Sequence, residues 1–515
     1  MPAPECIYQG REVLSSSEEK FERWRKGIGL FAGPLAFTII YLIPISYLSK
    51  EAHNLAAVLG LVLIFWLSEA IPLSVTAILG AILNIVFGVA PAKVVFAPFA
   101  DPIIFLFIGS FILAEAIRLH NLDKRFAFAI FSVKFVGESP YRVLFACGLI
   151  AAVVSMWISN TAATAMMLPI TLGVLHAMDE IHKEAGRASN IHDSSYATGM
   201  MLIIAYGASV GGIATPIGTP PNLIGIGLIQ SLAGVKITFF EWMAFAAPLT
   251  VIMFLLLYLI IRLLHPPHII KLDGIKGYIK RARQKLGVWS RGEINTAIAF
   301  SAAVFLWIFP SIVSMVLGKD SNISKFLSER LDEGVVAVIA ASLLFILPVN
   351  WKEKKFTITW ERAVKIDWGT ILLFGGGLSL GKLMFSTGLA DVIGKSLTNI
   401  TGAGSLWGIT AIAVFLAIIV SETTSNTASA NMVIPVMIAL ANGAGVSPIP
   451  PALGACLGAS FGFMLPVSTP PNAIVYGSGL VPILKMARAG IVFDVLGFFI
   501  ILGGLMVLCP LMGWV

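Results

Sequence analysis

A polar tetrapeptide, Ser-Asn-Thr-Ala, occurs twice in this sequence, at 159–162 and at 425–428, each time inside a long apolar stretch. The residues that follow each copy are small or apolar, which predicts that a helix begins at the motif. Ser and Asn are favourable N-cap residues, and the first N–H groups of a helix have no partner within it. Those donors and the positive end of the helix dipole can bind an anion without a cationic side chain. Two such sites facing each other would suit the two carboxylates of a four-carbon dicarboxylate.

A second duplicated element, Thr-Pro-Pro-Asn, stands at 219–222 and at 469–472. A Pro-Pro step inside an apolar span removes N–H donors and leaves upstream carbonyl oxygens free, here near Gly218 and Ser468. Unwound carbonyls of this kind coordinate cations in transporters. Hydroxyl groups that could complete such cages come in pairs one helical turn apart: Ser155 with Ser159, and Ser421 with Ser425.

Neither duplicated motif contains Arg or Lys. A dianion in a low-dielectric site needs compensating charge, and cations bound beside it would supply that charge. The two motifs in each half therefore predict a shared site for an anion and a cation.

The composition excludes an ordinary soluble protein. Of 515 residues only 12% are charged, compared with about 25% in soluble domains. Such a chain must expose most of its surface to lipid, so we expect a multi-pass protein of the cell (plasma or inner) membrane. The net charge of +7 is interpreted as the positive-inside bias of membrane proteins, and no nucleic-acid partner is expected. The four Cys residues have no metal-type spacing, and no organic cofactor is expected.

The apolar runs predict an all-α polytopic membrane protein with about 11 transmembrane helices. Two of these are interrupted helices, broken at the Pro-Pro steps, and two re-entrant hairpins carry the Ser-Asn-Thr tips at about 139–180 and about 403–445. Re-entrant segments are tolerated where protein or water covers their backbone. The expected organisation is a cytoplasmic N-terminal tail (1–26), a first span (27–49), repeat 1 with spans 2–6 (50–264), a cytoplasmic linker (265–292) and repeat 2 with spans 7–11 (293–515).

The distribution of the 35 Lys and Arg residues predicts the topology. With re-entrant hairpins, the large majority fall on one side, which the positive-inside rule assigns to the cytoplasm. This places the N-terminus inside and the C-terminus outside, with the first hairpin opening inward and the second outward. Because each half then holds an odd number of spans, the repeat is inverted. Inverted repeats with paired interrupted helices are typical of transporters, whose site lies near the membrane midplane.

At these duplicated motifs the chain resembles the divalent anion–sodium symporter family, which includes sodium-coupled dicarboxylate and citrate carriers, and the similarity covers nearly the whole chain from the second span onward. The resemblance implies a homodimer in which a transport domain moves as an elevator against a scaffold domain. It implies one sodium site at Ser155, Ser159, Asn160 and Gly218, and another at Ser421, Ser425, Asn426 and Ser468. It places the substrate carboxylates against Asn160, Thr161, Asn426 and Thr427, with Thr219-Pro220 and Thr469-Pro470 nearby.

The expected function is therefore secondary active transport of small dicarboxylates of the succinate, malate and fumarate class, coupled to sodium. The motifs are also compatible with a sodium-independent dicarboxylate exchanger, a sodium-coupled citrate carrier and a sulfate carrier. An intramembrane enzyme is disfavoured because the motifs offer Ser and Asn without a His or Asp partner to activate a nucleophile.

Overall fold

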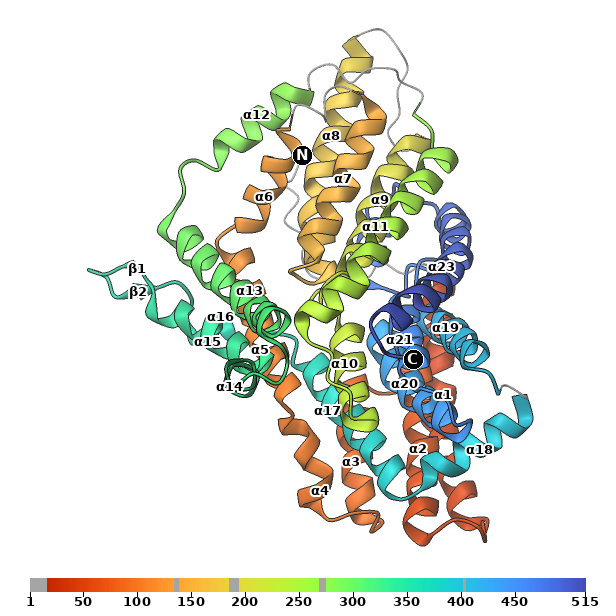
Figure 1. Ribbon diagram of the computed structural model, residues 1–515. Helices are drawn as coiled ribbons and strands as arrows, with labels where there is room; N and C mark the ends of the chain where they lie inside the picture. The colour runs from red at the N-terminus through yellow and green to blue at the C-terminus, as the bar shows by residue number, and fades with distance from the viewer. Residues whose placement is uncertain (1–15, 134–138, 185–193, 268–274, 402–403) are drawn as a thin grey trace.

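The computed structural model describes residues 16–133, 139–184, 194–267, 275–401 and 404–515, and helices form nearly all of its regular structure (Figure 1). Eight segments of this described part are long and apolar enough to cross a membrane. They are Lys50–Ser68, Ala92–Leu119, Asn160–Asp179, Phe239–Leu264, Arg291–Leu317, Trp368–Ser386, Leu406–Thr423 and Ile483–Leu511. The predicted helical, polytopic class is confirmed. Two of the eight, Asn160–Asp179 and Leu406–Thr423, are arms of the predicted re-entrant hairpins. The re-entrant course of those hairpins and the total of about 11 spans stay predictions.

The first half of the chain contains the following elements: α1 (Ser16–Leu42), α2 (Lys50–Ser68), α3 (Leu73–Val86), α4 (Ala92–Phe96), η2 (Ala97–Ala100), α5 (Pro102–Leu119), α6 (Leu122–Phe131), α7 (Pro140–Ser155), α8 (Asn160–Glu184), α9 (Ser195–Gly212), α10 (Pro220–Ala233), α11 (Phe239–Leu264) and α12 (Ile275–Lys285). The second half contains α13 (Arg291–Leu317), α14 (Asn322–Arg330), α15 (Glu333–Ile346), β1 (Pro348–Asn350), β2 (Lys355–Phe356), α16 (Trp360–Ala363), α17 (Trp368–Ser386), α18 (Leu389–Thr401), α19 (Leu406–Thr423), α20 (Asn426–Gly443), α21 (Ile449–Gly458), α22 (Pro470–Tyr476) and α23 (Ile483–Leu511).

Two predicted segments differ in their secondary structure. Helix α1 begins at Ser16, inside the predicted tail 1–26, and ends at Leu42, before the predicted end of the first span. The predicted linker 265–292 contains the basic helix α12. Residues 1–15 of the tail and 268–274 of the linker lie outside the described part of the chain.

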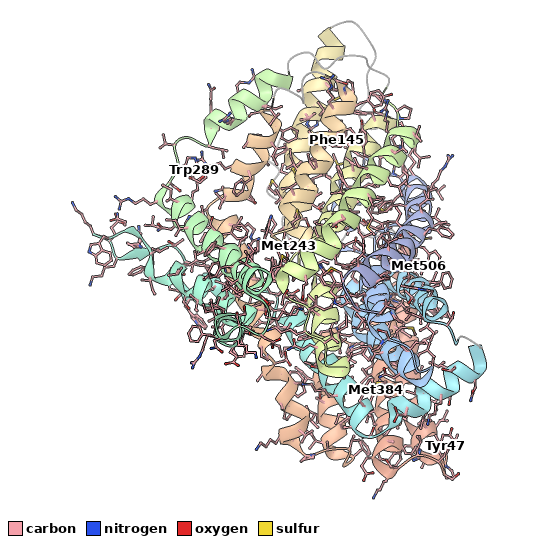
Figure 2. The ribbon with its side chains drawn as sticks, viewed as in Figure 1. Tyr47, Phe145, Met243, Trp289, Met384 and Met506 are labelled. Atoms are coloured by element: carbon pink, nitrogen blue, oxygen red, sulfur yellow. The ribbon has the colours of Figure 1, made fainter. Side chains whose placement is uncertain are left out.

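The end of the linker is tied to the first half by α6. The Arg125 side chain donates from Nε to Glu293 Oε1 at 2.6 Å, across the start of α13. Its guanidinium group also lies over the Trp289 ring, 4.8 Å from the centroid, at the place that Figure 2 labels. The short helix α6 therefore connects the two halves at one end of the molecule.

The helix starts and breaks follow the local sequence. Helix α8 begins at Asn160 and α20 at Asn426, as the duplicated tetrapeptide predicts. The apolar spans are interrupted between α9 and α10 and between α21 and α22, and each resumes at the first proline of Thr-Pro-Pro-Asn. Thr219 and Thr469 are extended, with φ of −144° and −143°, because a following proline disfavours the helical region.

The two halves pack with a matched pattern. Within each half, the first arm of the hairpin packs on the helix before the break: α7 on α9, and α19 on α21. Between halves, the second arm of each hairpin packs on the helix after the break in the other half: α20 on α10, and α8 on α22. The pairs α15–α5 and α3–α17 cross in the same way. This crossed packing brings the first tip to the second break and the second tip to the first.

The prediction of an all-α fold is wrong for one short segment, where β1 and β2 form an antiparallel hairpin. Helix α15 ends at Ile346 and Pro348 follows, which cannot continue a helix. Asn350 Oδ1 then accepts hydrogen bonds from the N–H groups of Lys352 and Glu353, at 3.1 and 3.3 Å, and so forms a side-chain turn. These residues were visible in the sequence as turn formers but did not predict paired strands.

Candidate functional site

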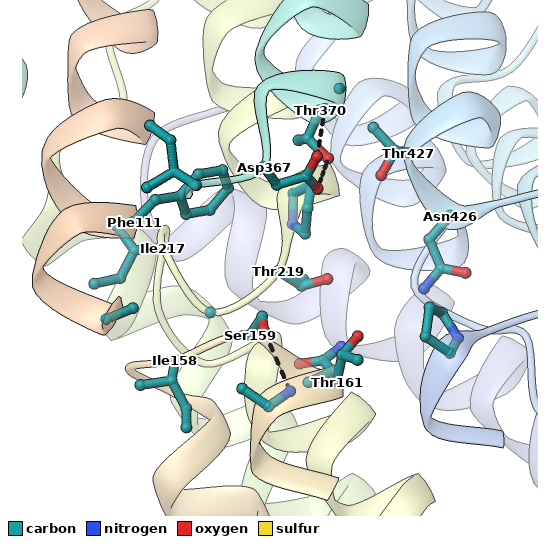
Figure 3. Close-up of a pocket in the computed structure, with 18 of the residues that line it drawn as sticks. Phe111, Ile158, Ser159, Thr161, Ile217, Thr219, Asp367, Thr370, Asn426 and Thr427 are labelled. Carbon is teal, nitrogen blue, oxygen red and sulfur yellow. Dashed lines mark hydrogen bonds between the residues drawn. The ribbon is translucent and has the colours of Figure 1, made fainter. Parts of the chain in front are cut away.

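Both tips and both breaks line one cavity of about 710 Å³. Of the residues predicted for the site, the cavity wall includes Ser159, Asn160, Thr161, Gly218, Thr219, Pro220, Ser425, Asn426, Thr427, Ser468, Thr469 and Pro470. Ser155 and Ser421 lie behind this wall, fully buried. Figure 3 shows Thr161 and Thr219 across the cavity from Asn426 and Thr427. Residues far apart in the sequence thus meet as the duplicated motifs predict.

The rest of the wall comes from α5, from the start of α3, from the segment that follows α7, and from the start of α17 with the residues just before it. It includes Phe111 and Thr370, which Figure 3 shows facing the first tip. It also includes two basic and two acidic residues: Arg118, Lys365, Glu115 and Asp367. Because these four charges balance, the wall offers no net positive charge for an anion.

Both tips present the start of a helix to the cavity. At the first, Ser159 Oγ accepts a hydrogen bond from the N–H of Ala162 at 3.3 Å. At the second, Ser425 Oγ accepts from Ala428 at 3.2 Å. Each serine therefore caps one N–H group and leaves the remaining donors of the first turn, with the helix dipole, for a ligand. Thr161 is exposed to the cavity and Thr427 is half-buried in its wall.

An oxygen cluster lies behind the first tip. Ser155 Oγ donates to Asn160 Oδ1 at 2.6 Å. The Asn160 amide can also turn its nitrogen toward this cluster, where it would donate to the carbonyl oxygens of Ala208 at 3.1 Å and Gly218 at 3.3 Å. With Oδ1 inward instead, the cluster consists of carbonyl, amide and hydroxyl oxygens. A small hard cation is the ligand that such a set of oxygens lacks.

The second tip repeats this arrangement. Ser421 Oγ lies 2.8 Å from Asn426 Oδ1 and 2.8 Å from the carbonyl oxygen of Ala459. One hydroxyl proton cannot serve both acceptors fully, so this cluster is also rich in oxygen lone pairs. A Cβ added at Gly462 would lie 3.3 Å from Asn426 Oδ1 and 3.3 Å from the carbonyl oxygen of Ser421. The close approach of these oxygens thus depends on a glycine.

Ser468 differs from its predicted role in one respect. Its hydroxyl group donates toward Glu422, at 2.8 Å from Oε2 and 3.0 Å from the carbonyl oxygen. The hydroxyl therefore holds the broken helix to the end of α19. Coordination of a cation by the Ser468 backbone oxygen stays a prediction.

The last residue of each Thr-Pro-Pro-Asn motif does not line the cavity but holds the break beside it, a role that sequence reasoning missed. Asn222 Nδ2 lies within hydrogen-bonding distance of the carbonyl oxygens of Gly212 at 2.9 Å and Thr215 at 2.7 Å. Asn472 Nδ2 donates in the same way to Gly462 at 2.9 Å and Leu465 at 3.0 Å. Both side chains are fully buried, and each ties the unwound segment to the next helix. Their signal was present, since a duplicated Asn inside an apolar span needs buried partners.

Within the described residues, no group of three or more His, Cys, Asp or Glu side chains could hold a metal ion. The oxygen clusters consist instead of neutral groups, namely amides, hydroxyls and backbone carbonyls. Such groups are ligands for hard monovalent ions rather than for zinc or copper.

A long helical chain with two facing helix starts and two broken spans defines a membrane transporter. The model of the family described as "Sodium:sulfate symporter transmembrane region" matches residues 25–515, and the chain belongs to this family. It is a transporter and not an enzyme.

Curated relatives cover most of the chain. The sodium-dependent dicarboxylate transporter SdcS of Staphylococcus saprophyticus is 35% identical over 478 residues, which are 92% of this chain and 89% of that protein. SdcS of Staphylococcus aureus is 32% identical over 479 residues, with the same shares. Among solved structures, the YdaH transporter of Alcanivorax borkumensis matches with a TM-score of 0.54 at 14% identity, covering 96% of this chain and 98% of that one. The last similarity concerns the fold alone.

Proposed function

We propose that this chain is a secondary active transporter that moves small dicarboxylates of the succinate, malate and fumarate class across the membrane together with sodium. The observation that carries the proposal is that both helix starts and both oxygen clusters meet at one cavity. The relatives named sodium-dependent dicarboxylate transporter support a dicarboxylate substrate and coupling to sodium.

The duplicated tips favour a substrate with two anionic groups. One carboxylate would accept hydrogen bonds at Asn160 and Thr161, and the other at Asn426 and Thr427, on facing sides of the cavity. Thr219-Pro220 and Thr469-Pro470 would border the bound substrate. Sulfate is the second candidate because the family description names it. It is compact and carries its charge on one centre, so it would use a single tip.

Sodium supplies the charge that the cavity wall lacks. The first cation would lie among the oxygens of Ser155, Ser159, Asn160 and Gly218, and the second among those of Ser421, Ser425, Asn426 and Ser468. Both cations would lie directly behind the helix starts that bind the carboxylates. Substrate and sodium would therefore bind cooperatively, because each offsets the charge of the other.

The arrangement of helices favours an elevator mechanism. The cavity lies between the hairpin arms with the broken helices on one side, and α5 with α17 on the other. The crossed packing of the halves is what an inverted repeat produces. Arg118 and Lys365 in the cavity wall belong to the segments that the charge bias assigns to the cytoplasm, which corresponds to an inward-open state. The homodimer and the cytoplasmic N-terminus belong to the same proposal.

The test is uptake of radiolabelled succinate by proteoliposomes containing the full chain. An inward sodium gradient should drive accumulation above equilibrium, and unlabelled malate or fumarate should compete. Replacement of sodium by choline separates the proposed symporter from a sodium-independent exchanger, which would keep transporting when the liposomes are preloaded with succinate. Stronger competition by citrate or by sulfate than by malate would indicate a citrate carrier or a sulfate carrier. If sodium, proton and counter-substrate gradients all fail to move any dicarboxylate, the proposal is wrong.

A further inference from the structure

One buried acidic residue stands beside the second oxygen cluster and has no counterpart beside the first. Glu422 follows Ser421 at the end of α19, and Met156 follows Ser155 at the corresponding place after α7. The Glu422 side chain is only 6% exposed. A carboxylate that is this buried requires hydrogen-bond donors or a nearby cation.

The donors come from the unwound segment between α21 and α22. Glu422 Oε1 accepts from the backbone N–H groups of Phe463 at 2.6 Å and Met464 at 2.8 Å. Its Oε2 accepts from Ser468 Oγ at 2.8 Å. Three donors on one carboxylate offset the cost of burying it. These three hydrogen bonds also hold the end of α19 to the unwound segment between α21 and α22.

A second buried carboxyl group, that of Asp494 in α23, lies near Glu422. Asp494 is 5% exposed, and neither of its oxygens has a hydrogen-bond partner among the described residues. Tyr206 of α9 packs on the same segment and donates its hydroxyl to the carbonyl oxygen of Phe463 at 2.6 Å.

The first cluster has different supports. The Thr215 hydroxyl donates to the carbonyl oxygen of Met156. The Trp242 indole donates to the carbonyl oxygen of Ile213 at 3.0 Å. Neutral hydroxyl, indole and amide groups thus hold the unwound segment between α9 and α10. The corresponding segment between α21 and α22 is held by a carboxylate. The two clusters thus have similar oxygen atoms but different nearby charge.

We infer that Glu422 is a positioning residue of the second sodium site, whose negative charge makes this site bind sodium more tightly than the first. The inference rests on the proposed sodium coupling. Two of the residues that would bind this cation contact Glu422: Ser421 precedes it in the chain, and Ser468 hydrogen-bonds its carboxylate. We therefore expect the sodium affinities of the two sites to differ by roughly ten- to hundredfold. The second site would then fill at lower sodium concentration, and would prepare the second tip for a carboxylate before the first site is occupied.

The test compares the sodium dependence of succinate uptake in three variants of the full chain: Glu422→Gln, Asp494→Asn and the double variant. Gln keeps the shape, can accept from Phe463 and Met464, and can donate to Ser468. In the single Glu422→Gln variant, Asp494 remains as a nearby buried carboxyl group, so the shift in half-saturating sodium concentration should be smaller than in the double variant. The double variant should raise the half-saturating sodium concentration at least tenfold while the maximal rate at saturating sodium is kept. Asp494→Asn alone should change it little.

Each outcome separates the possibilities. A purely structural role would lower the maximal rate or the thermal midpoint without moving half-saturation, and an unchanged half-saturating concentration in the folded double variant overturns the inference. If the double variant does not fold, sodium titration of the wild-type chain by intrinsic tryptophan fluorescence decides. Two binding phases should appear, of which Asn426→Ala removes the tighter and Asn160→Ala the weaker. A single phase, or the reverse assignment, overturns the inference, whereas no sodium response in the wild type contradicts the proposed function itself.

Discussion

The two tips of this transporter place matching groups around their clusters but secure the neighbouring chain differently. At the first, Asn160 meets a serine hydroxyl and the Ala208 carbonyl oxygen. At the second, a serine hydroxyl lies between Asn426 and the Ala459 carbonyl oxygen. What differs is the support, which is neutral at the first tip and carries a buried carboxylate at the second. Oxygen geometry is thus duplicated, whereas electrostatic environment is not.

This difference bears on the order of events during transport. Two sites with equal oxygens and unequal nearby charge will not fill at the same ion concentration. The more negative site would hold its ion first and shape one half of the substrate site. The other site would then bind its ion together with the substrate. A strictly symmetric pair would have no such order.

The largest expected effect comes from removing either tip asparagine. Asn160→Ala and Asn426→Ala each delete an amide that faces both the oxygen cluster and the cavity, so the proposed substrate and ion contacts would be lost together. Each variant should lower succinate uptake by roughly a hundredfold and abolish the succinate-induced thermal shift. Asn350→Ala, at the end of β1 and outside the cavity wall, is the matched control and should transport normally. Full substrate binding by both tip variants would refute the site.

The glycines beside the clusters should separate the two tips. A Cβ at Gly212 would overlap Asn160 Oδ1, whereas at Gly462 it would lie 3.3 Å from Asn426 Oδ1. Gly212→Ala should therefore displace the first amide and reduce uptake by at least tenfold, while Gly462→Ala should cost only a few-fold because a small shift relieves the contact. Sodium titration of uptake measures both. Equal losses in the two variants would mean that the clusters are packed alike, contrary to the structure.

Substitution of the asparagines after the breaks should lower the stability of the chain more than its transport activity. Asn222 Nδ2 has three backbone carbonyls within reach, the third being that of Ile213 at 3.3 Å. Asn472 Nδ2 has two. Each buried carbonyl left without a donor costs about 1–3 kcal/mol. The Ile213 carbonyl keeps its hydrogen bond from the Trp242 indole, so each variant removes the amide donor of two carbonyls. Asn222→Ala and Asn472→Ala should therefore each lower the thermal midpoint in detergent by several degrees and by similar amounts. A much smaller loss in one variant would show that its break is held by other groups.

Local rules explain why the sequence predicted the tips and the breaks. Helix starts at Asn160 and Asn426 depend on capping residues a few positions away, and the breaks depend on prolines that act on their immediate neighbours. These features follow from short stretches of sequence and could be predicted together with the cavity they form.

Contacts between distant segments could not be predicted in the same way. The contact of Glu422 with Phe463 joins residues that are far apart in the chain, and it exists because α19 packs on α21. Without that packing, Glu422 was one of several ionisable residues in apolar runs. The roles of Asn222 and Asn472 depend likewise on how each broken helix closes on itself.

The smallest effect on stability is expected at two contacts between the halves, made by the loop before α11 and by the loop before α23. The loop before α11 holds Lys236 Nζ 2.9 Å from Asp332 and 3.4 Å from Glu333. The loop before α23 accepts a hydrogen bond at the Leu480 carbonyl oxygen from Thr198 Oγ1 at 2.9 Å, and Thr198 is buried. Thr198→Val should cost about 1 kcal/mol. Lys236→Gln should cost about 0.5 kcal/mol, because the ion pair is partly exposed and salt screens it.

The pH dependence of the thermal midpoint further distinguishes the Lys236 ion pair from the Thr198 hydrogen bond. Burial lowers the pKa of Lys236, but Glu333 and Asp332 raise it by more, so that it ends above its usual value of 10.5. The ion pair therefore stabilises the folded chain fully below pH 10.5 and loses its contribution as the pH rises through the raised pKa. The difference in thermal midpoint between wild type and Lys236→Gln should shrink above pH 10.5 and on addition of salt, whereas that for Thr198→Val should change with neither. A difference for Lys236→Gln that is the same at pH 8 and pH 11 would mean that the lysine acts through packing of its stem and not through its charge.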